Sequence, residues 1–457
     1  MSKKTTAYKS IRTPIDDFLK KYSGKKPVRL HMPGHKGKGV INRYDITEVD
    51  GADSLYYARG IIKESEEIAS EIFASNTFYS TEGSSHCIRA MVRLICEYAY
   101  YKGETPLIFA VRNAHRSFIS ALALTGCDVK WLYGEKTGNY LSCKITAETF
   151  ETLFSSAETL PTAVYLTSPD YLGVTADIEG ISRVCKKYGV LLAVDNAHGA
   201  YLKFLTPSAH PIDLGADMCS DSAHKTLNSL TGSAYLHISK SAPEILVEKA
   251  KSALALFGST SPSYLILQSL DKLNLILGNG YKEEHFKFCT KLRSLKASLK
   301  IFGYELIGDE ELKITVKCKE YGYRGREINE ILKSENFIPD FYDDDYVVMM
   351  FTPEITESKL KKLLKVFKSI PQKEPIIDLY PNFSSPRKAM SVAEAYKKPT
   401  ERISVENANG RILAEDEISC PPAVPLIVAG EIIDEKIISA MKYYNIAEIK
   451  VVSEGQV

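Results

Sequence analysis

Asp221-Ser-Ala-His-Lys-Thr226 is the stretch from which the fold and the chemistry of this chain can be derived. It follows a short apolar run that is typical of a buried strand, and a segment rich in hydroxyl groups comes after it. An amine at the end of a strand, beside hydroxyl groups that can bind phosphate, is suited to react with an aldehyde and form a Schiff base. Lys225 is therefore a candidate nucleophile. A solvated lysine on a loop is the alternative, because His-Lys pairs are common.

A second polar segment, Val194-Asp-Asn-Ala-His-Gly199, lies earlier in the chain and also ends an apolar run. In open α/β sheets, ligands bind at the carboxyl edge, where such segments meet. A carboxylate at this edge can keep a ring nitrogen protonated through a charge-assisted hydrogen bond. Asp195 is the candidate for this role, with a helix N-cap as the alternative.

A third segment, Ser80-Thr-Glu-Gly-Ser-Ser-His86, precedes a helix predicted over 87–101. Gly83, Ser84 and Ser85 would then lie at the positive end of that helix. Free N–H groups and hydroxyls in this position form a cradle for a phosphate. An ordinary N-cap is the alternative for this segment.

A fourth segment, Arg112-Asn-Ala-His-Arg-Ser117, follows another apolar run. Its imidazole, His115, could lie against a flat aromatic ring bound at the same edge of the sheet. A surface histidine with satisfied hydrogen bonds is the alternative. Each segment alone is a weak signal, but the two strand-end motifs that contain Lys225 and Asp195 are together much stronger than either alone.

Short apolar runs alternate with helical patterns through the first half of the chain, which predicts a mostly parallel α/β sheet covered on both faces. The runs lie at 106–111, 163–167, 190–194, 216–219 and 233–238, and one of the helices at 178–188. A long helical stretch from 264 to about 300 follows. Strand and helix patterns then alternate to residue 369, which predicts a smaller α+β domain.

Four parts are predicted along the chain: an arm and loop over 1–40, a large cofactor-binding domain over 41–265, a smaller domain over 266–370, and a C-terminal domain over 371–457. The last boundary is placed in a polar, proline-rich stretch. A final helix and strand are expected at the end of the C-terminal domain.

The composition is that of an ordinary globular protein. The 457 residues are 44% hydrophobic and 25% charged, with 58 basic and 57 acidic side chains. A formal net charge of +1 argues against a nucleic-acid partner or an anionic membrane, and no apolar run is long enough to span a bilayer. Nine cysteines without a CxxC pair are typical of reduced thiols, so a cytoplasmic location is expected.

No metal site is predicted. His31 and His35 have helical ligand spacing, but Pro33 and Gly34 lie between them and rule out a helix. The cysteines have no metal-ligand spacing either. The chain is also not expected to bind NAD, because no GxGxxG follows its early strands.

Eight segments in chain order resemble the ornithine/lysine/arginine decarboxylase family of pyridoxal-phosphate enzymes, in its shorter bacterial branch without the N-terminal wing domain. The segments are His31-Met-Pro-Gly-His-Lys36, Gly83-Ser-Ser85, Arg112-Asn-Ala-His115, Ser168-Pro-Asp-Tyr-Leu-Gly173, Asp195-Asn-Ala-His198, Ser222-Ala-His-Lys225, Ser259-Thr-Ser-Pro262 and Pro421-Pro-Ala-Val-Pro425. The resemblance implies the aspartate-aminotransferase fold, with a smaller α+β domain and a C-terminal decarboxylase domain.

The resemblance implies pyridoxal 5'-phosphate as cofactor and gives each motif residue a role. Lys225 would bind the cofactor covalently, Asp195 would hold the pyridine nitrogen, and His115 would stack on the ring; with His224 they form the expected catalytic set. The remaining cofactor-binding residues implied are Gly83, Ser84, Ser85, Ala197, His198, Ser222, His224, Ser259 and Thr260. Of these, Ser259 and Thr260 resemble a segment that reaches the phosphate of a neighbouring subunit, which implies a homodimer with shared active sites.

The implied reaction is α-decarboxylation of a basic L-amino acid in amine or polyamine metabolism, with arginine as the first candidate substrate and lysine or ornithine after it. His224 or Lys225 would return a proton to Cα. Two alternatives remain open: an aminotransferase or acyltransferase with the same fold, and a relative that binds the cofactor without catalysis. An NAD-linked oxidoreductase is disfavoured.

Three departures from the family pattern bear on function. Glu82 stands where an asparagine is usual and would place a like charge near the phosphate. Ser84 and Ser85 replace threonines, which is a mild change. Cys420-Pro-Pro-Ala replaces Tyr-Pro-Pro-Gly, which bears on substrate identity.

Tyr171 and Asp53 are two further candidates for the pocket, with an ordinary surface position as the alternative, since a tyrosine or aspartate in a loop usually lies on the surface. The loop that contains His31 and His35 is expected to help complete the pocket at the dimer interface. The side chain that recognises the substrate's distal charge cannot be chosen among the 57 acidic residues.

Overall fold

The computed structural model describes residues 11–134, 139–377, 381, 385–416 and 422–454. Its largest element is a seven-stranded sheet with the order β1-β7-β6-β5-β4-β2-β3. Neighbouring strands from β3 to β6 run parallel, and β7 runs antiparallel to both of its neighbours. The strands are β1 Asn76–Ser80, β2 Leu107–Val111, β3 Asp128–Leu132, β4 Ala163–Thr167, β5 Leu191–Asp195, β6 Met218–Asp221 and β7 Ala234–Ile238. The predicted mostly parallel α/β fold is confirmed.

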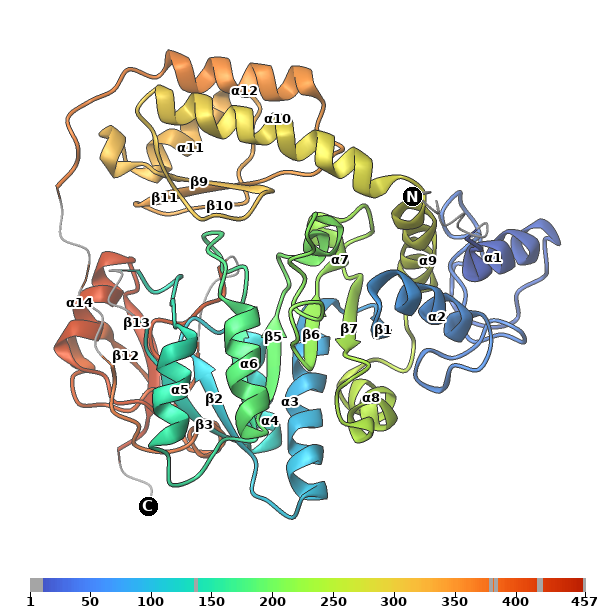
Figure 1. Cartoon of the computed structure of the whole chain (residues 1–457), viewed down its shortest axis with the longest axis horizontal. Helices are drawn as coiled ribbons and strands as arrows, with labels where there is room; N and C mark the ends of the chain where they lie inside the picture. The colour runs from blue at the N-terminus through green and yellow to red at the C-terminus, as the bar shows by residue number, and fades with distance from the viewer. Residues whose placement is uncertain (1–10, 135–138, 378–380, 382–384, 417–421, 455–457) are drawn as a thin grey trace, which may run out of the picture.

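Both faces of this sheet are buried, which explains why its strands are apolar at almost every position. In β2, Ile108 and Ala110 belong to one apolar core, while Phe109 and Val111 belong to the core on the other face. The first core includes side chains of α3 and α4, and the second includes those of α5 and α6 (Figure 1). The helices associated with this sheet are α2 Ile61–Phe73, α3 Gly83–Tyr101, α4 Arg116–Thr125, α5 Ala147–Ser155, α6 Ile178–Tyr188, α7 Ala223–Thr226 and α8 Glu244–Phe257.

The arm begins with α1, Pro14–Gly24, which packs on α2 and on α9, Tyr264–Gly278. The long helical stretch expected from 264 to about 300 is two helices, α9 and α10 Tyr281–Ile301. Gly280 separates them with a backbone φ of 83°, a left-handed conformation that glycine adopts without strain. The single long helix was therefore a wrong prediction.

A second, antiparallel sheet lies above the carboxyl edge of the large one (Figure 1). Its strands are β8 Glu305–Ile307, β9 Lys313–Lys317, β10 Phe341–Tyr342 and β11 Tyr346–Met350, in the order β10-β11-β9-β8. Its helices are α10, α11 Gly325–Ser334 and α12 Glu357–Ser369. The sheet lies between α10 and α12 on one side and the large domain on the other, so β9 and β10 can contribute side chains to the carboxyl edge.

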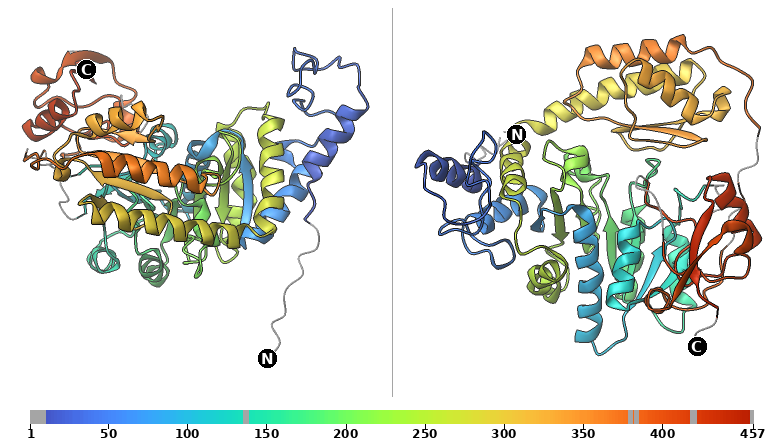
Figure 2. Two further views of the ribbon diagram at one scale, coloured as in Figure 1. Left: turned by 90° about the horizontal axis from the view of Figure 1, so that it is seen from above. Right: turned by 180° about the vertical axis from the view of Figure 1, so that it is seen from behind.

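The C-terminal part is a small α/β unit beside β2 and β3, seen from behind in Figure 2. It contains α13 Val392–Ala395, β12 Thr400–Ser404, α14 Glu435–Tyr443 and β13 Glu448–Val452. The expected final helix and strand are present as α14 and β13. Among the described residues, no helix combines the length and apolar character that crossing a membrane requires.

Candidate active site

A cavity of about 290 Å³ lies at the carboxyl edge of the large sheet, beyond the ends of β4, β5 and β6. It brings together most of the residues predicted from the four polar segments. The predicted residues that line it are Gly83, Ser84, Ser85, His115, Asp195, Ala197, His198, Ser222, His224 and Lys225. Parallel strands place their ends at one edge, which is why segments far apart in the sequence meet here.

Lys225 belongs to the one-turn helix α7 directly after β6, and its side chain reaches His198 from the β5 end. The Nζ atom of Lys225 lies 3.0 Å from Nε2 of His198. Burial lowers the pKa of His198 well below its usual value, and the nearby charges of Lys225 and Lys313 lower it further. The imidazole of His198 is therefore neutral beside the amine.

Asp195 is the last residue of β5 and is 2% exposed. Its carboxylate accepts the backbone N–H of Ala197 at 3.1 Å and the Tyr165 hydroxyl at 3.4 Å. Burial raises the pKa of Asp195, while the Lys225 charge and the Ala197 N–H oppose that shift. Such a carboxylate is stabilised by a cationic partner brought into the cavity. The N-cap alternative does not describe it, since the strand leads into an irregular loop.

The start of α3 and the residue before α7 form another part of the cavity wall. Gly83 has a φ of 73°, in the left-handed region, which lets the chain turn into α3 directly after β1. The hydroxyl of Ser222 donates to that of Ser84 at 2.8 Å. With Ser85, these groups place hydroxyls and free backbone N–H groups at the positive end of a long helix, a site suited to a phosphate.

Two histidines of the cavity have defined tautomers. His115 caps α4, and its Nδ1 accepts the backbone N–H of Ser117 at 3.1 Å, so its ring proton is on Nε2. Burial and the Lys225 charge lower the pKa of His115 to about 3. The Nδ1 atom of His224 lies 2.8 Å from the carbonyl oxygen of Ser233. Because a carbonyl only accepts, Nδ1 carries the ring proton. Burial lowers the pKa of His224 as well.

Glu82, the departure from the family pattern, lies on the wall of the cavity. Its carboxylate accepts the backbone N–H of Ser259 at 2.6 Å. Ser259 and Thr260 are exposed and do not line the cavity of their own chain. Their predicted role belongs to a neighbouring subunit and stays a prediction.

Three residues of the site were missed from the sequence. Lys313 of β9 is 3% exposed, and its Nζ lies 3.2 Å from Nδ1 of His198, 3.2 Å from the Asp170 carbonyl and 3.1 Å from the Tyr171 carbonyl. Thr167 and Asn113 line the cavity, and Thr167 Oγ1 and Asn113 Oδ1 are buried without hydrogen-bond partners among the described residues. Thr167 ends a predicted strand, so the strand-end rule would have found it.

The C-terminal part closes one side of the cavity through Pro422 and Val424. Arg112, at the end of β2, holds this segment by donating to the carbonyls of Pro425 and Leu426 at 3.2 and 3.1 Å. The same guanidinium pairs with the buried carboxylate of Glu431 at 3.3 Å. The family segment that begins at Pro421 therefore packs against the cavity, although Cys420 and Pro421 themselves lie outside the described residues.

The two further pocket predictions, Tyr171 and Asp53, have different outcomes. Tyr171 lines the cavity, and its ring meets that of His198 edge-on at 5.3 Å. Asp53 does not line it: its carboxylate accepts backbone N–H groups of residues 54, 59, 60, 62 and 63 and so organises the loop before α2. The prediction for Asp53 was wrong, because an aspartate in a loop often binds nearby backbone N–H groups. His31 and His35 pair with Tyr22 and Asp45 and also lie away from this chain's cavity.

Comparison with known families gives two matches along the chain. A family model described as "Orn/Lys/Arg decarboxylase, major domain" matches residues 13–287. A second, described as "Orn/Lys/Arg decarboxylase, C-terminal domain", matches residues 377–451. The first match alone covers more than half of the chain and includes all four polar segments.

Similar proteins and structures agree with these matches. An arginine decarboxylase of Bacillus subtilis (strain 168) is 29% identical over 465 residues, which cover 93% of this chain and 92% of that protein. An arginine decarboxylase of Bacillus anthracis is also 29% identical, over an alignment that covers 93% of this chain and 91% of that protein. Among solved structures, the Francisella novicida lysine decarboxylase LdcF has a TM-score of 0.79 at 16% identity, covering 97% of this chain and 81% of its own. The E. coli constitutive lysine decarboxylase has a TM-score of 0.77 at 17% identity, covering 97% and 82%.

Proposed function

The chain belongs to the Orn/Lys/Arg decarboxylase family, and from this premise we propose that it removes the α-carboxylate of a basic L-amino acid, with arginine as the first candidate and lysine or ornithine after it. The observation that carries the proposal is that Asp195, the last residue of β5, and Lys225, in the one-turn helix after the neighbouring strand β6, line one cavity. The names of the Bacillus relatives support arginine. The product would be the amine with one carboxylate fewer, released with carbon dioxide.

Pyridoxal 5'-phosphate is the proposed cofactor, because the side chains of the cavity fit its parts. The buried carboxylate of Asp195 suits a protonated ring nitrogen, and the start of α3 with Ser84 and Ser222 suits the phosphate. The partnerless Thr167 Oγ1 and Asn113 Oδ1 offer further polar contacts. When bound, this cofactor accepts the electron pair that loss of the carboxylate leaves on Cα.

The chain's own residues hold the reactants and handle the proton. Lys225 would attach the cofactor aldehyde and release it to the substrate amine. Asp195 would keep the ring nitrogen charged, and the imidazole of His115, which lines the cavity, would stack on the ring. We assign the proton that returns to Cα to Lys225 rather than His224, because the Nδ1 proton of His224 is held by the Ser233 carbonyl. His198, 3.0 Å from the Lys225 amine, can exchange a proton with it.

A homodimer with shared active sites is the proposed assembly. The loop of the arm exposes large apolar side chains, which a monomer rarely shows in one place. Val28, Leu30, Val40 and Ile41 are each at least 65% exposed. The same loop carries His31 and His35, and Ser259 and Thr260 are also exposed. A partner subunit covering these segments would bring them to its own cavity.

The four-part division into 1–40, 41–265, 266–370 and 371–457 is kept as a proposal for the folding units. A cytoplasmic location is proposed from the cysteine usage. The eight cysteines among the described residues are free, and seven of them are buried.

The test is an absorbance spectrum of the purified protein with added pyridoxal phosphate, followed by separate additions of arginine, lysine and ornithine while carbon dioxide is recorded. We expect a band of covalently bound cofactor that is absent in Lys225→Ala, and carbon dioxide from one substrate. Normal turnover by Lys225→Ala would contradict the assignment of the nucleophile. A band without carbon dioxide would favour a transferase with this fold or a binding role.

A further inference from the structure

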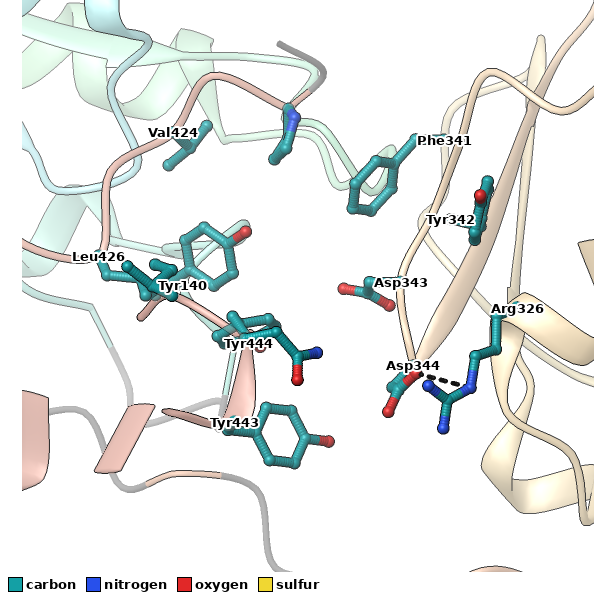
Figure 3. Close-up of a pocket in the computed structure, with 13 residues that line it drawn as sticks. Tyr140, Arg326, Phe341, Tyr342, Asp343, Asp344, Val424, Leu426, Tyr443 and Tyr444 are labelled. Atoms are coloured by element: carbon teal, nitrogen blue, oxygen red, sulfur yellow. Dashed lines mark ion pairs between the residues drawn. The ribbon is translucent and has the colours of Figure 1, made fainter. Parts of the chain in front are cut away.

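A second cavity, of about 390 Å³, adjoins the one that contains Lys225. It lies between the hairpin of β10 and β11 on one side and the C-terminal part on the other (Figure 3). Its aromatic lining comes from Tyr140, Phe341, Tyr443 and Tyr444, and its acidic lining from the turn of the hairpin. An aromatic cavity with carboxylates is suited to an organic cation, because ring faces attract positive charge.

The two cavities share part of their walls. Pro422 and Val424 line both of them. Tyr171, which lines the first cavity, meets the ring of Phe341 from the second edge-on at 5.3 Å. The second cavity is therefore next to the one that contains Lys225, on the side where the far end of an elongated substrate would lie.

Asp343 presents the carboxylate oxygen that lacks a partner. Its Oδ1 accepts the backbone N–H groups of Asp345 and Tyr346 at 2.8 and 2.7 Å, while Oδ2 is buried with no hydrogen-bond partner among the described residues. Burial and the charge of Asp345 raise the pKa of Asp343 to about 7. A cation beside Oδ2 would relieve both effects.

The neighbouring acids already have cationic partners. Asp344 pairs with Arg324 at 2.8 Å and Arg326 at 3.5 Å, and Asp345 pairs with Lys319 at 2.6 Å. In Figure 3 the Asp343 carboxylate points from the hairpin toward Tyr140 and Tyr444, whereas Asp344 lies against Arg326. Oδ2 of Asp345 also has no hydrogen-bond partner among the described residues, but Asp345 does not line the cavity, so Asp343 is the acid available to a ligand there.

We propose that the second cavity receives the distal guanidinium or ammonium group of the basic amino-acid substrate, with Oδ2 of Asp343 as its acceptor and the rings of Tyr140 and Tyr444 beside it. This inference rests on the proposed function and names the residue that selects its substrate. An uncharged side chain of equal length would leave Asp343 unpaired, and sites that contain such a group reject ligands that cannot bind it. The cation is recognised by charge and by its aromatic surroundings together.

The test compares Asp343→Asn and Asp343→Ser with the wild type, loaded with pyridoxal phosphate. Both replacements keep an oxygen that can accept the N–H groups of the turn, so the hairpin is retained. We expect kcat/KM for the preferred basic amino acid to fall by about 10- to 100-fold, mainly through KM, because a charged hydrogen bond is lost. The absorbance of bound cofactor and the Tm should stay at the wild-type values.

A binding measurement that needs no turnover accompanies the kinetics. The product amine should inhibit the wild type competitively and inhibit both variants at least tenfold more weakly, while a monoamine of the same length, which lacks the distal cation, should inhibit all three equally. Glu354→Gln, an exposed acid of the same part of the chain, is the matched control and should behave as the wild type.

The outcomes separate the two proposals. If the wild type releases no carbon dioxide from any basic amino acid, the proposed function is wrong and this inference falls with it. If the wild type is active and both variants keep kcat/KM and product inhibition within twofold, the function stands and the assignment of Asp343 is overturned.

Discussion

The Nζ atom of Lys225 lies 3.0 Å from Nε2 of His198. The other ring nitrogen of His198 lies 3.2 Å from Nζ of Lys313. A neutral imidazole has one N–H and one acceptor nitrogen, so it can accept from one of the two lysines and must donate to the other. Lys313 also faces two carbonyls, which need donors, and is therefore the donor to Nδ1. The proton of His198 is then on Nε2, the ring nitrogen that faces the amine of Lys225.

The first prediction concerns Lys313→Met. Since the Lys313 charge lowers the pKa of His198, its removal should raise that pKa and release the Nε2–H tautomer. Nitrogen-15 shifts of labelled histidines in the cofactor-free protein should show His198 taking up a proton at a higher pH in Lys313→Met than in the wild type. Lys313→Arg should preserve the wild-type behaviour. Lys317→Met, on the same strand, is the control. An unchanged His198 signal in Lys313→Met would show that Lys313 does not set the protonation of His198.

Asp195→Asn should lower kcat by several orders of magnitude while the cofactor remains bound. A neutral amide no longer favours a protonated ring nitrogen, so the electron-accepting form of the ring is lost. Steady-state rates and the absorbance of bound cofactor measure the two effects separately. Asp217→Asn, which removes a charge at the other end of β6, should leave the rate unchanged. Full activity of Asp195→Asn would mean that this carboxylate has only a structural role.

Glu82→Gln should tighten pyridoxal-phosphate binding about fivefold. The carboxylate repels a phosphate at the start of α3 by about 1 kcal/mol, whereas an amide oxygen can still accept the Ser259 N–H. Fluorescence titration of the cofactor-free protein gives Kd, and the gain should shrink at high salt, because exposed charges are screened. Equal or weaker binding by the variant would show that Glu82 does not oppose the phosphate.

The pH dependence of stability should include a contribution from His285, which is fully buried in α10. Burial lowers the pKa of His285 to about 4, from about 6.5 in an unfolded chain. Between these values the unfolded chain binds a proton that the folded one does not, so stability falls by about 1.4 kcal/mol for each pH unit lost. The free energy of unfolding in urea, measured between pH 6 and 5, should therefore depend less steeply on pH in His285→Gln than in the wild type. Lys287→Gln should keep the wild-type slope. Equal slopes in His285→Gln and the wild type would refute this.

The large sheet and most of its site could be predicted, because both depend on local patterns. An apolar run followed by a polar segment places Lys225 and Asp195 at a strand end, and parallel pairing then brings them together. Lys313 could not be predicted, since its strand belongs to another sheet and only tertiary packing places it against His198. The break at Gly280 was missed because the helical pattern continues on both sides of it.

The hydrogen bonds from Arg112 to Pro425 and Leu426, and its ion pair with Glu431, have a consequence for engineering. In sequence the C-terminal module looks detachable, but in the fold it supplies three acceptors of the buried Arg112 guanidinium and a wall of the reaction chamber. Deleting the module would remove these acceptors and open that wall of the chamber. Chimeras that exchange C-terminal modules between relatives should therefore carry the Arg112 strand end and its acceptors as one transplanted unit.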